Sequence, residues 1–281
     1  MDNYILTMNQ FGLFQQHLAE EERELGTIEK YMREVKKFAL WQGRRKVTKE
    51  TVSEWKEQLR TAGYKPETVN GKLSAVNKFL ICMGWGECCV KYLKIQRRLF
   101  RSTGRELTKD EYTRLVETAQ GLGKTRLALL IETICATGIR VSEVKYITAE
   151  ALRAGRADIS LKGKIRTVLL PGKLCRKLQK YAKKQKITSG EIFLTRSGKG
   201  ISRRQIWAEM KALCKQARVA PSKVFPHNLR HLFARTFYRV SRDVAKLADV
   251  LGHSSIETTR IYLISTGAEH VRQLERLGLI S

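Results

Sequence analysis

The sequence has few acidic residues and no long apolar run. Its 281 residues include 27 Asp and Glu against 54 Lys and Arg, a formal net charge of +27. No stretch reaches the ~18 apolar residues of a membrane span, and residues 1–10 lack the basic and then apolar layout of a signal peptide. We therefore expect a soluble, cytoplasmic protein. The charge indicates a polyanionic partner, with nucleic acid as the leading candidate, because Lys and Arg contacts with phosphates release counterions.

The sequence also lacks the motifs of metal and nucleotide sites. None of its six cysteines forms a C-x-x-C pair, and most lie in apolar segments. We expect reduced thiols rather than disulfides or a zinc site. There is no P-loop and no G-x-G-x-x-G motif, whose backbone N–H groups would cradle nucleotide phosphates. The sequence therefore predicts neither a bound metal nor a cofactor.

The first 95 residues predict a small helical domain. At ~100–200 residues per domain, the length indicates two domains. Apolar residues recur at helical spacing between residues that start helices (Thr27, Thr48 and Pro66) and residues that end them (Gly43 and Gly63). We predict four helices, over residues 8–23, 27–43, 48–63 and 66–84. A bundle of this kind with many Lys and Arg on its polar faces is typical of a DNA-binding module.

The remainder predicts a linker and a second domain. Residues 96–106 are basic without an apolar stripe, so we interpret them as an interdomain linker that runs along DNA. The second domain, residues 107–281, begins with a capping box of Thr108 and Glu111. The patterns predict helices over 125–137, 173–186 and 203–218, a β-hairpin over 159–171 and a short strand over 191–195. The fold class is therefore mainly α, with one small antiparallel sheet.

The stretch from Pro226 to Tyr262 holds the clearest chemistry. His227 and Arg230 are spaced i,i+3, which places both on one face of a helix. A titratable group beside a fixed cation suits a phosphodiester better than a carbonyl. His253 in Leu-Gly-His-Ser and then Tyr262 follow. Two other interpretations stay open: each residue alone is more often packing or surface, and residues 244–262 also fit a helix-turn-helix, which needs no catalysis.

With Arg140 in the run GIRVSE, the order of motifs becomes specific. It continues with a lysine in the hairpin, H-x-L-R-H, L-G-H and a tyrosine. In this order, and with spacings similar to those of Xer-type members, the chain resembles the tyrosine recombinase (phage integrase) family. The resemblance covers about the whole chain. It implies a SAM-like helical core-binding domain over 1–95 and a catalytic domain with a C-terminal tail helix.

The resemblance implies a role for each residue at a family position. Arg140 and Arg230 match the paired arginines, whose planar forks suit phosphate oxygens and the charge of the transition state. Tyr262 matches the nucleophile, and His227 matches the position usually given the general-base role. His253 matches the second histidine, which donates a hydrogen bond to the phosphate.

A hairpin lysine matches the general acid that protonates the leaving 5′ oxygen. Both Lys162 and Lys164 lie in SLKGKIRTV, and the Lys-Gly placement favours Lys162. The alternative for either lysine is a solvated hairpin charge. His231, the remaining histidine of H-x-L-R-H, is expected to be structural and to point away from the Arg230 face.

The implied reaction is a transesterification. Tyr262 attacks a DNA phosphate, which leaves a 3′-phosphotyrosyl bond and a free 5′-hydroxyl, and a hydroxyl of the same or a partner strand reverses the step. The covalent bond conserves the bond energy, so neither a metal nor a nucleotide is required. The family resemblance implies that two DNA duplexes are joined through a four-way junction inside a homotetramer. The amphipathic residues 268–281 either pack on their own domain or dock on a neighbouring copy.

The biological role is less specific than the chemistry. We favour integration and excision of a mobile element, with Xer-type resolution of chromosome or plasmid dimers as the alternative. A non-catalytic helix-turn-helix regulator would leave Arg140 and the pairing of His227 with Arg230 unexplained. A type IB topoisomerase shares the phosphotyrosine chemistry but relaxes supercoils without a partner duplex.

Overall fold

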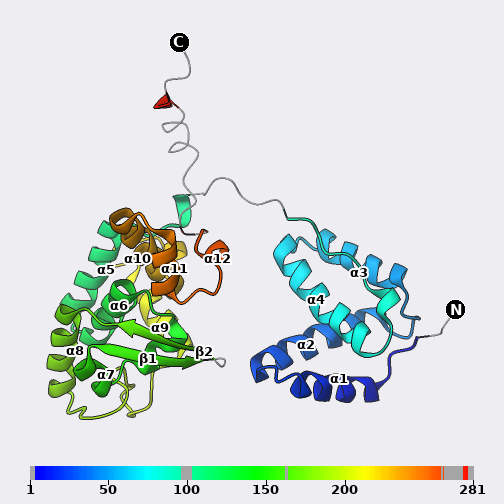
Figure 1. The fold of residues 1–281 in the computed structure, drawn as a ribbon, viewed down its shortest axis with the longest axis horizontal. Helices are drawn as coiled ribbons and strands as arrows, with labels where there is room; N and C mark the ends of the chain where they lie inside the picture. The colour runs from blue at the N-terminus through cyan, green and yellow to red at the C-terminus, as the bar shows by residue number, and fades with distance from the viewer. Residues whose placement is uncertain (1–3, 96–102, 162–163, 261, 263–274, 278–281) are drawn as a thin grey trace. The chain divides into compact units, whose positions relative to one another are not determined.

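A computed structural model of the chain describes residues 4–95, 103–161, 164–260, 262 and 275–277. The chain divides into two compact units, Met1–Arg97 and Arg98–Ser281, and Figure 1 traces both. Most of the expected linker, and most of the C-terminal segment 268–281, lie outside the described residues. The assignment of DNA binding to the first unit and of catalysis to the second stays a prediction.

Unit 1 is a bundle of helices. Its elements are α1 (Met8–Glu20), α2 (Leu25–Gln42), α3 (Lys49–Thr61), α4 (Pro66–Cys82) and the short 3₁₀ helix η1 (Gly86–Cys88). Thr48 caps α3 as expected, because its side chain accepts a hydrogen bond from the Thr51 N–H. The expected cap at Thr27 is wrong. The N-cap of α2 is Glu24, and Thr27 lies in the first turn, where its N–H donates to the Glu24 carbonyl.

The core of unit 1 is aromatic and contains one buried ion pair. The Phe14 and Phe79 rings meet edge to face at 5.3 Å, and Phe38 meets Trp55 in the same way at 5.2 Å. Lys72 Nζ lies 2.6 Å from Glu34 Oε2, and both side chains are at most 10% exposed. The pair satisfies a charge that would otherwise be costly to bury.

The first α-helix of unit 2 begins at the expected capping box. The Thr108 N–H donates to Glu111 Oε2 at 2.9 Å, and the Glu111 N–H donates to Thr108 Oγ1 at 3.1 Å. The elements of this unit are, in order, η2 (Thr103–Arg105), α5 (Lys109–Gly121), α6 (Thr125–Thr137), η3 (Val141–Tyr146), α7 (Ala149–Ala154), β1 (Arg156–Leu161), β2 (Lys164–Leu169), α8 (Gly172–Lys184), α9 (Arg203–Leu213), η4 (Pro221–Lys223), α10 (Pro226–Ser241), α11 (Val244–Leu251) and α12 (Ile256–Arg260).

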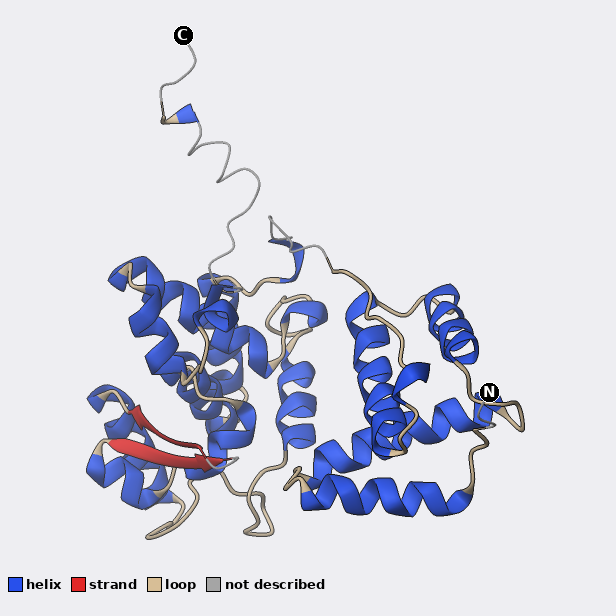
Figure 2. Ribbon diagram, turned by 45° about the vertical axis from the view of Figure 1, so that its right-hand side comes forward, coloured by secondary structure: helices blue, strands red, loops and turns tan. Residues whose placement is uncertain are grey.

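The sheet of the described chain is the single hairpin of β1 and β2, as the colours of Figure 2 show. The strands are antiparallel, with Ile159 opposite Arg166 and Ala157 opposite Val168. The prediction of a mainly helical fold with one small antiparallel sheet is confirmed. The expected strand over 191–195 is wrong, because that segment makes only isolated bridges, from Glu191 to Thr148 and from Leu194 to Gly200. The helix expected over 203–218 ends earlier, at Leu213.

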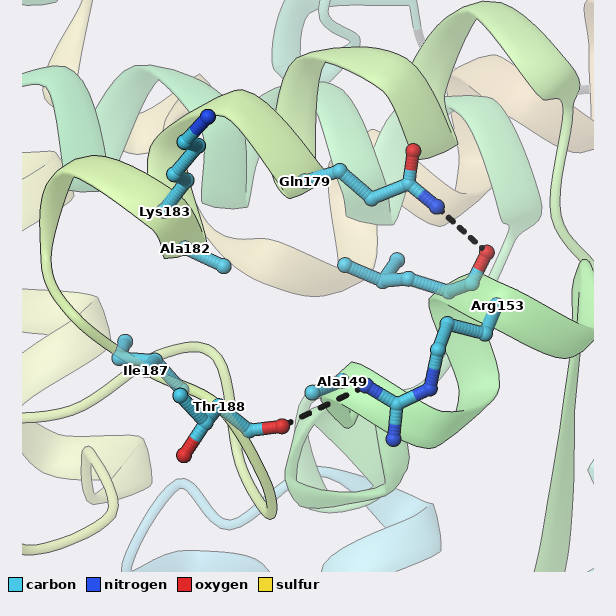
Figure 3. A pocket seen from close by; sticks show the side chains of 8 residues that line it. Ala149, Arg153, Gln179, Ala182, Lys183, Ile187 and Thr188 are labelled. Carbon is cyan, nitrogen blue, oxygen red and sulfur yellow. Dashed lines mark hydrogen bonds between the residues drawn. The ribbon is translucent and has the colours of Figure 1, made fainter.

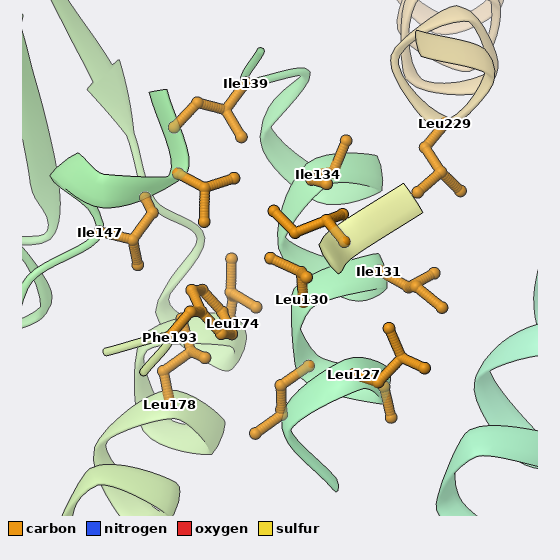
Figure 4. Close-up of a cluster of buried hydrophobic side chains, with 14 of the residues drawn as sticks. Leu127, Leu130, Ile131, Ile134, Ile139, Ile147, Leu174, Leu178, Phe193 and Leu229 are labelled. Atoms are coloured by element: carbon orange, nitrogen blue, oxygen red, sulfur yellow. The ribbon is translucent and has the colours of Figure 1, made fainter. Parts of the chain in front are cut away.

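α6 is the central helix of unit 2. Its buried side chains include Leu127, Leu130 and Ile134, which lie among side chains from α8, α10 and the loop after α8, such as Phe193 and Leu229 (Figure 4). The helix ends at Gly138, which takes the left-handed conformation at φ +63. The chain then turns directly into Arg140, so the most buried helix of the unit places the first of the expected site residues.

No helix in the part of the chain that the structure describes is long and apolar enough to cross a membrane.

Candidate active site

α10 brings two of the expected residues, and His231 with them, to one face. The helix starts at Pro226, whose missing N–H has no partner to lose at that position. His227, Arg230 and His231 follow at i, i+3 and i+4, so their side chains share a face. α10 packs on α6 and α11, and α11 packs on α12 (Figure 1). Through Arg230, the face meets the C-terminal ends of α6 and α11.

The guanidinium of Arg230 joins these helix ends. The residue is 2% exposed. Its Nη1 donates to the carbonyl of Gly138, and its Nη2 donates to the carbonyl of Leu251 at 2.8 Å. Both carbonyls belong to helix C-termini, where backbone acceptors lack partners within the helix. Burial and the nearby charge of Arg140 lower the pKa of Arg230 to about 10, against an opposing interaction with Tyr262, so the group stays charged at neutral pH.

His253 is held as one neutral tautomer. Its Nε2 lies 2.9 Å from Arg230 Nη2, and it must accept because a guanidinium only donates. Its Nδ1–H therefore donates to Thr259 Oγ1, 2.8 Å away. Burial, followed by the charges of Arg230 and Arg140, lowers the pKa of His253 to about 4. In the free protein, the expected phosphate donor is thus neutral, and its Nε2 is already engaged.

Arg140 is fixed by a buried carboxylate. Glu143 is 2% exposed. Its Oε2 accepts the backbone N–H of Arg140 at 2.8 Å, and its Oε1 accepts Nη1 of the same residue at 2.9 Å. A second cation, Arg166 Nη2, lies 2.5 Å from Oε2. Burial alone would raise the pKa of Glu143, but the Arg140 N–H and the charge of Arg166 hold it below its usual value.

Tyr262 lies among the histidines and is 4% exposed. Its ring centroid is 4.4 Å from that of His231, 5.8 Å from that of His253 and 6.2 Å from that of His227. Tyr262 also belongs to a buried apolar cluster that includes Leu251. The structure thus brings together Arg140, His227, Arg230, His253 and Tyr262.

His227 is the exposed member of this group. Its pKa is lowered, first by partial desolvation and then by the charges of Arg230 and Arg140. An imidazole that is neutral at physiological pH and open to solvent can accept a proton from an incoming or neighbouring group.

The position of His231 corrects the sequence analysis. The residue was expected to point away from the site, but its ring contacts the rings of both His227 and Tyr262. The reason is the i,i+4 spacing from His227, which places the two histidines on one face as effectively as i,i+3 places Arg230.

The general-acid lysine stays a prediction. Lys162, the favoured candidate, lies outside the described residues, and Lys164 is described only as the first residue of β2.

Three contacting residues were missed by the sequence analysis: Glu143, Arg166 and Thr259. Glu143 stood in the quoted run GIRVSE, three residues after Arg140, a spacing that allows the observed capping contact. Nothing in the sequence around Arg166 or Thr259 indicated a role. Arg166 contacts Glu143 and Val250, which are distant in sequence, and Thr259 contacts His253, which lies outside its own helix.

A pocket of about 360 Å³ lies elsewhere in unit 2 (Figure 3). It is lined by residues of α7, of α8 and of the loop after α8. Two of its polar side chains bond to backbone carbonyls at its rim, Gln179 to Leu152 at 3.1 Å and Arg153 to Thr188 at 3.4 Å. None of the five residues that the structure brings together around Tyr262 lines it, so the pocket is separate from the candidate active site.

Comparison with known proteins agrees with this geometry. The sequence pattern of the phage integrase family matches residues 105–269, which include every residue of the cluster. The chain belongs to the phage integrase family. It is accordingly a DNA-binding enzyme of the tyrosine-type site-specific recombinases.

Named relatives of the family cover most of the chain. The tyrosine recombinase XerA of Pyrococcus furiosus is 28% identical over 233 residues, 79% of this chain and 78% of the relative. The tyrosine recombinase XerD of Bifidobacterium longum is 34% identical over 175 residues, 56% of each protein.

Solved structures share the fold at low identity. The Tn1549 transposon integrase in complex with transposon right end DNA has a TM-score of 0.70 at 17% identity, and the match covers 96% of this chain and 99% of that one. A lambda integrase tetramer bound to a Holliday junction has a TM-score of 0.74 at 17% identity, with coverages of 93% and 78%.

Proposed function

We propose that this recombinase cuts and rejoins DNA strands through a 3′-phosphotyrosyl bond to Tyr262. The observation that carries the proposal is the placing of a tyrosine against two histidines and a buried arginine, beside a second arginine held by Glu143.

The charge of the cluster suits phosphoryl transfer. The cluster holds three guanidinium groups, those of Arg140, Arg166 and Arg230, and one carboxylate, that of Glu143, which Arg140 and Arg166 contact. These four side chains therefore carry an excess of two positive charges. A phosphodiester carries one negative charge, and attack by a phenolate adds a second as the transition state forms. Fixed cations in a partly desolvated site stabilise that charge without reorganisation.

Bonds and protons balance in each step. The Tyr262 oxygen forms a bond to phosphorus, and the bond from phosphorus to the 5′ oxygen breaks. His227 takes the phenol proton, and Lys162 protonates the leaving 5′ oxygen. Attack by a 5′-hydroxyl in the second step reverses both transfers, so no external energy source is required.

His253 reaches its proposed role only after a change of partners. Its Nε2 accepts from Arg230 in the free protein. To donate to a phosphate from Nε2, the ring needs a proton on that atom. Its hydrogen bond with Arg230 Nη2 must therefore break first. We propose that a phosphate oxygen takes over the Arg230 donor, after which His253 changes tautomer.

The proposed partners are double-stranded DNA and further copies of the chain. The net charge of +27 supports strong phosphate contacts, and a DNA substrate is consistent with a cytoplasmic protein. We propose that two duplexes meet in a homotetramer, in which residues 268–281 dock on a neighbouring copy. Deletion of these residues should abolish pairing of DNA sites while single-site binding is retained. A truncated protein that still pairs sites would overturn this assignment.

We propose integration and excision of a mobile element as the biological role, which the fold similarity to the Tn1549 transposon integrase and to lambda integrase supports. Xer-type dimer resolution is the second candidate, because the named relatives are XerA and XerD recombinases. Recombination of a plasmid with two directly repeated sites, compared with joining of element ends to a target, separates the two roles.

Covalent trapping tests the chemistry. Duplexes that flank the gene, or that are selected from a random library by binding, are nicked near the candidate cleavage site so that the released fragment diffuses away. The wild-type protein should give an SDS-resistant adduct, and Tyr262→Phe should give none. Tyr238→Phe is the matched control, because Tyr238 packs against the same apolar cluster as Tyr262.

Two results would overturn the proposal. Tight binding without an adduct on every bound duplex, native element ends included, would favour a non-catalytic regulator. Relaxed plasmid as the sole product, with no recombinant junction, would indicate a topoisomerase.

A further inference from the structure

Arg166 lies on β2, and its side chain is 15% exposed. Its Nη2 donates to Glu143 Oε2 at 2.5 Å, and its Nη1 donates to the carbonyl of Val250 at 3.2 Å. Within the described part of the chain, its buried Nε has no hydrogen-bond partner. One fork therefore spans two acceptors that lie 107 residues apart in sequence, from Glu143 after α6 to Val250 near the end of α11.

The first acceptor holds a residue of the site. Glu143 accepts both the backbone N–H and the guanidinium of Arg140. Arg166 binds the same carboxylate oxygen as that backbone N–H, so the carboxylate has a second cationic partner besides Arg140. A carboxylate with two cationic partners has a narrower range of positions than one with a single partner.

The second acceptor begins the turn that presents His253. Arg166 binds the Val250 carbonyl, and Arg230 binds the next one, of Leu251. Gly252 follows in the left-handed conformation at φ +63, and a Cβ atom there would clash with Cδ and Nη1 of Arg166. The turn thus has glycine both for its backbone angle and for the close approach of this side chain.

We propose that Arg166 is a positioning residue of the recombinase, which sets Arg140 and His253 in one geometry by bridging Glu143 to the end of α11. The inference rests on the proposed function, and it adds a residue that touches neither the phosphate nor the tyrosine. Its effect on the reaction passes through the residues at its two ends.

The separation of the two acceptors explains why position 166 holds an arginine. A guanidinium presents donors on two nitrogens in a rigid plane, so it reaches Glu143 and Val250 together. A lysine carries the same charge on a single nitrogen. That nitrogen can keep the ion pair with Glu143 but cannot also reach the Val250 carbonyl. Arg166→Lys therefore removes the bridge while it leaves a cation beside the buried Glu143.

The test compares Arg166→Lys with Arg156→Lys. Arg156 lies on β1 of the same hairpin, is 61% exposed, and has a loose ion pair with Asp158 at 3.8 Å. For each protein, the single-turnover rate of adduct formation is measured at saturating DNA, and the DNA dissociation constant is measured separately. We expect Arg166→Lys to lower the saturated rate about 100-fold, the typical cost of a small misplacement of catalytic groups, with an unchanged dissociation constant. Arg156→Lys should change neither.

A second measurement does not depend on activity. The amide N–H groups of Gly252 and His253 donate to Asp249 and Ala248 in the turn after α11. Their hydrogen exchange should become faster in Arg166→Lys and stay unchanged in Arg156→Lys. If the wild-type protein forms no adduct on any DNA that it binds, the proposed function fails, and this comparison still decides whether Arg166 holds the turn.

A double variant tests whether the two residues act through one bridge. Glu143→Gln keeps the size of the side chain but removes the charge that Arg166 contacts, so it breaks the same bridge from its other end. If both residues act through one bridge, the rate loss of the double variant should be close to that of the more affected single variant. A saturated rate of Arg166→Lys equal to that of the wild type, a loss that saturating DNA restores, or multiplied losses in the double variant would each overturn the proposal.

Discussion

Protonation of His253 should destabilise unit 2 as the pH falls from 6.5 towards 4. Burial and the charges of Arg230, Arg140 and Arg166 lower the pKa of this histidine from 6.5 to about 4. The unfolded chain therefore binds a proton at a higher pH than the folded chain does. For a histidine shifted in this direction, the stabilising contribution is fully present above pH 6.5 and is lost as the pH falls to about 4.

The size of the effect follows from the shift. At 1.36 kcal/mol per pKa unit, the whole shift corresponds to roughly 3 kcal/mol, of which about 2 kcal/mol is lost by pH 5. For a domain of the size of unit 2, a loss of about 2 kcal/mol lowers the thermal midpoint by about 6 °C. The lowered pKa of His227 acts in the same direction, so a smaller dependence should persist without His253.

The assay is calorimetric unfolding between pH 8 and pH 5, for the wild type and for His253→Gln. The glutamine amide can accept from Arg230 and donate to Thr259 without titrating, so the variant should have a flatter profile. Histidine side-chain NMR of the wild type should show one ring that stays neutral at pH 5. Parallel pH profiles for the two proteins, or titration of His253 near pH 6.5, would refute the reasoning.

Three further predictions concern single contacts. Gly252→Ala introduces a Cβ at φ +63 against Arg166 and should cost about 2 kcal/mol, so a thermal midpoint equal to that of the wild type would contradict the clash. Thr108→Ala removes the side-chain cap of α5. It should lower the free energy of unfolding, measured in urea, by about 1 kcal/mol and leave adduct formation unchanged. Lys72→Met removes the closest partner of the 7% exposed Glu34 side chain, which keeps Arg33 at 3.1 Å and Lys37 at 3.6 Å. The change should cost about 2 kcal/mol, less than the loss of a sole partner. The added change Glu34→Met should restore most of that stability, and an equal loss in the double variant would show that the ion pair is not the cause.

Much of the fold could be predicted from local signals. The capping box at Thr108 and the glycine stop at Gly138 are determined within one helical turn, and the corresponding helix ends were predicted correctly. The segment 191–195 was read as a strand from its apolar residues. A strand needs a partner along its length, and here the chain offers only single bridges. Pairing of this kind depends on tertiary structure, which local composition does not contain.

The candidate site shows the same difference between features that the local sequence predicts and features that depend on tertiary structure. The order of Arg140, His227, Arg230, His253 and Tyr262 in sequence was enough to select these residues, and the fold brings all five together. Their hydrogen-bonding state was not predictable, because it depends on side chains from other elements. Glu143 and Arg166 determine how Arg140 is held. Arg230 determines the tautomer of His253, and Thr259 accepts its Nδ1–H.

These contacts also indicate what DNA must change. In the free protein, Arg230 donates to two helix-terminal carbonyls and to His253, and Tyr262 is 4% exposed. Two of the groups proposed to bind a phosphate, Arg230 and His253, are therefore already engaged by the protein itself. A phosphate oxygen carries more negative charge than a carbonyl or an imidazole nitrogen, and hydrogen bonds to charged acceptors are roughly twice as strong as neutral ones. We infer that the phosphate displaces His253 from Arg230 Nη2, and that the same exchange frees His253 to change tautomer and donate to the phosphate.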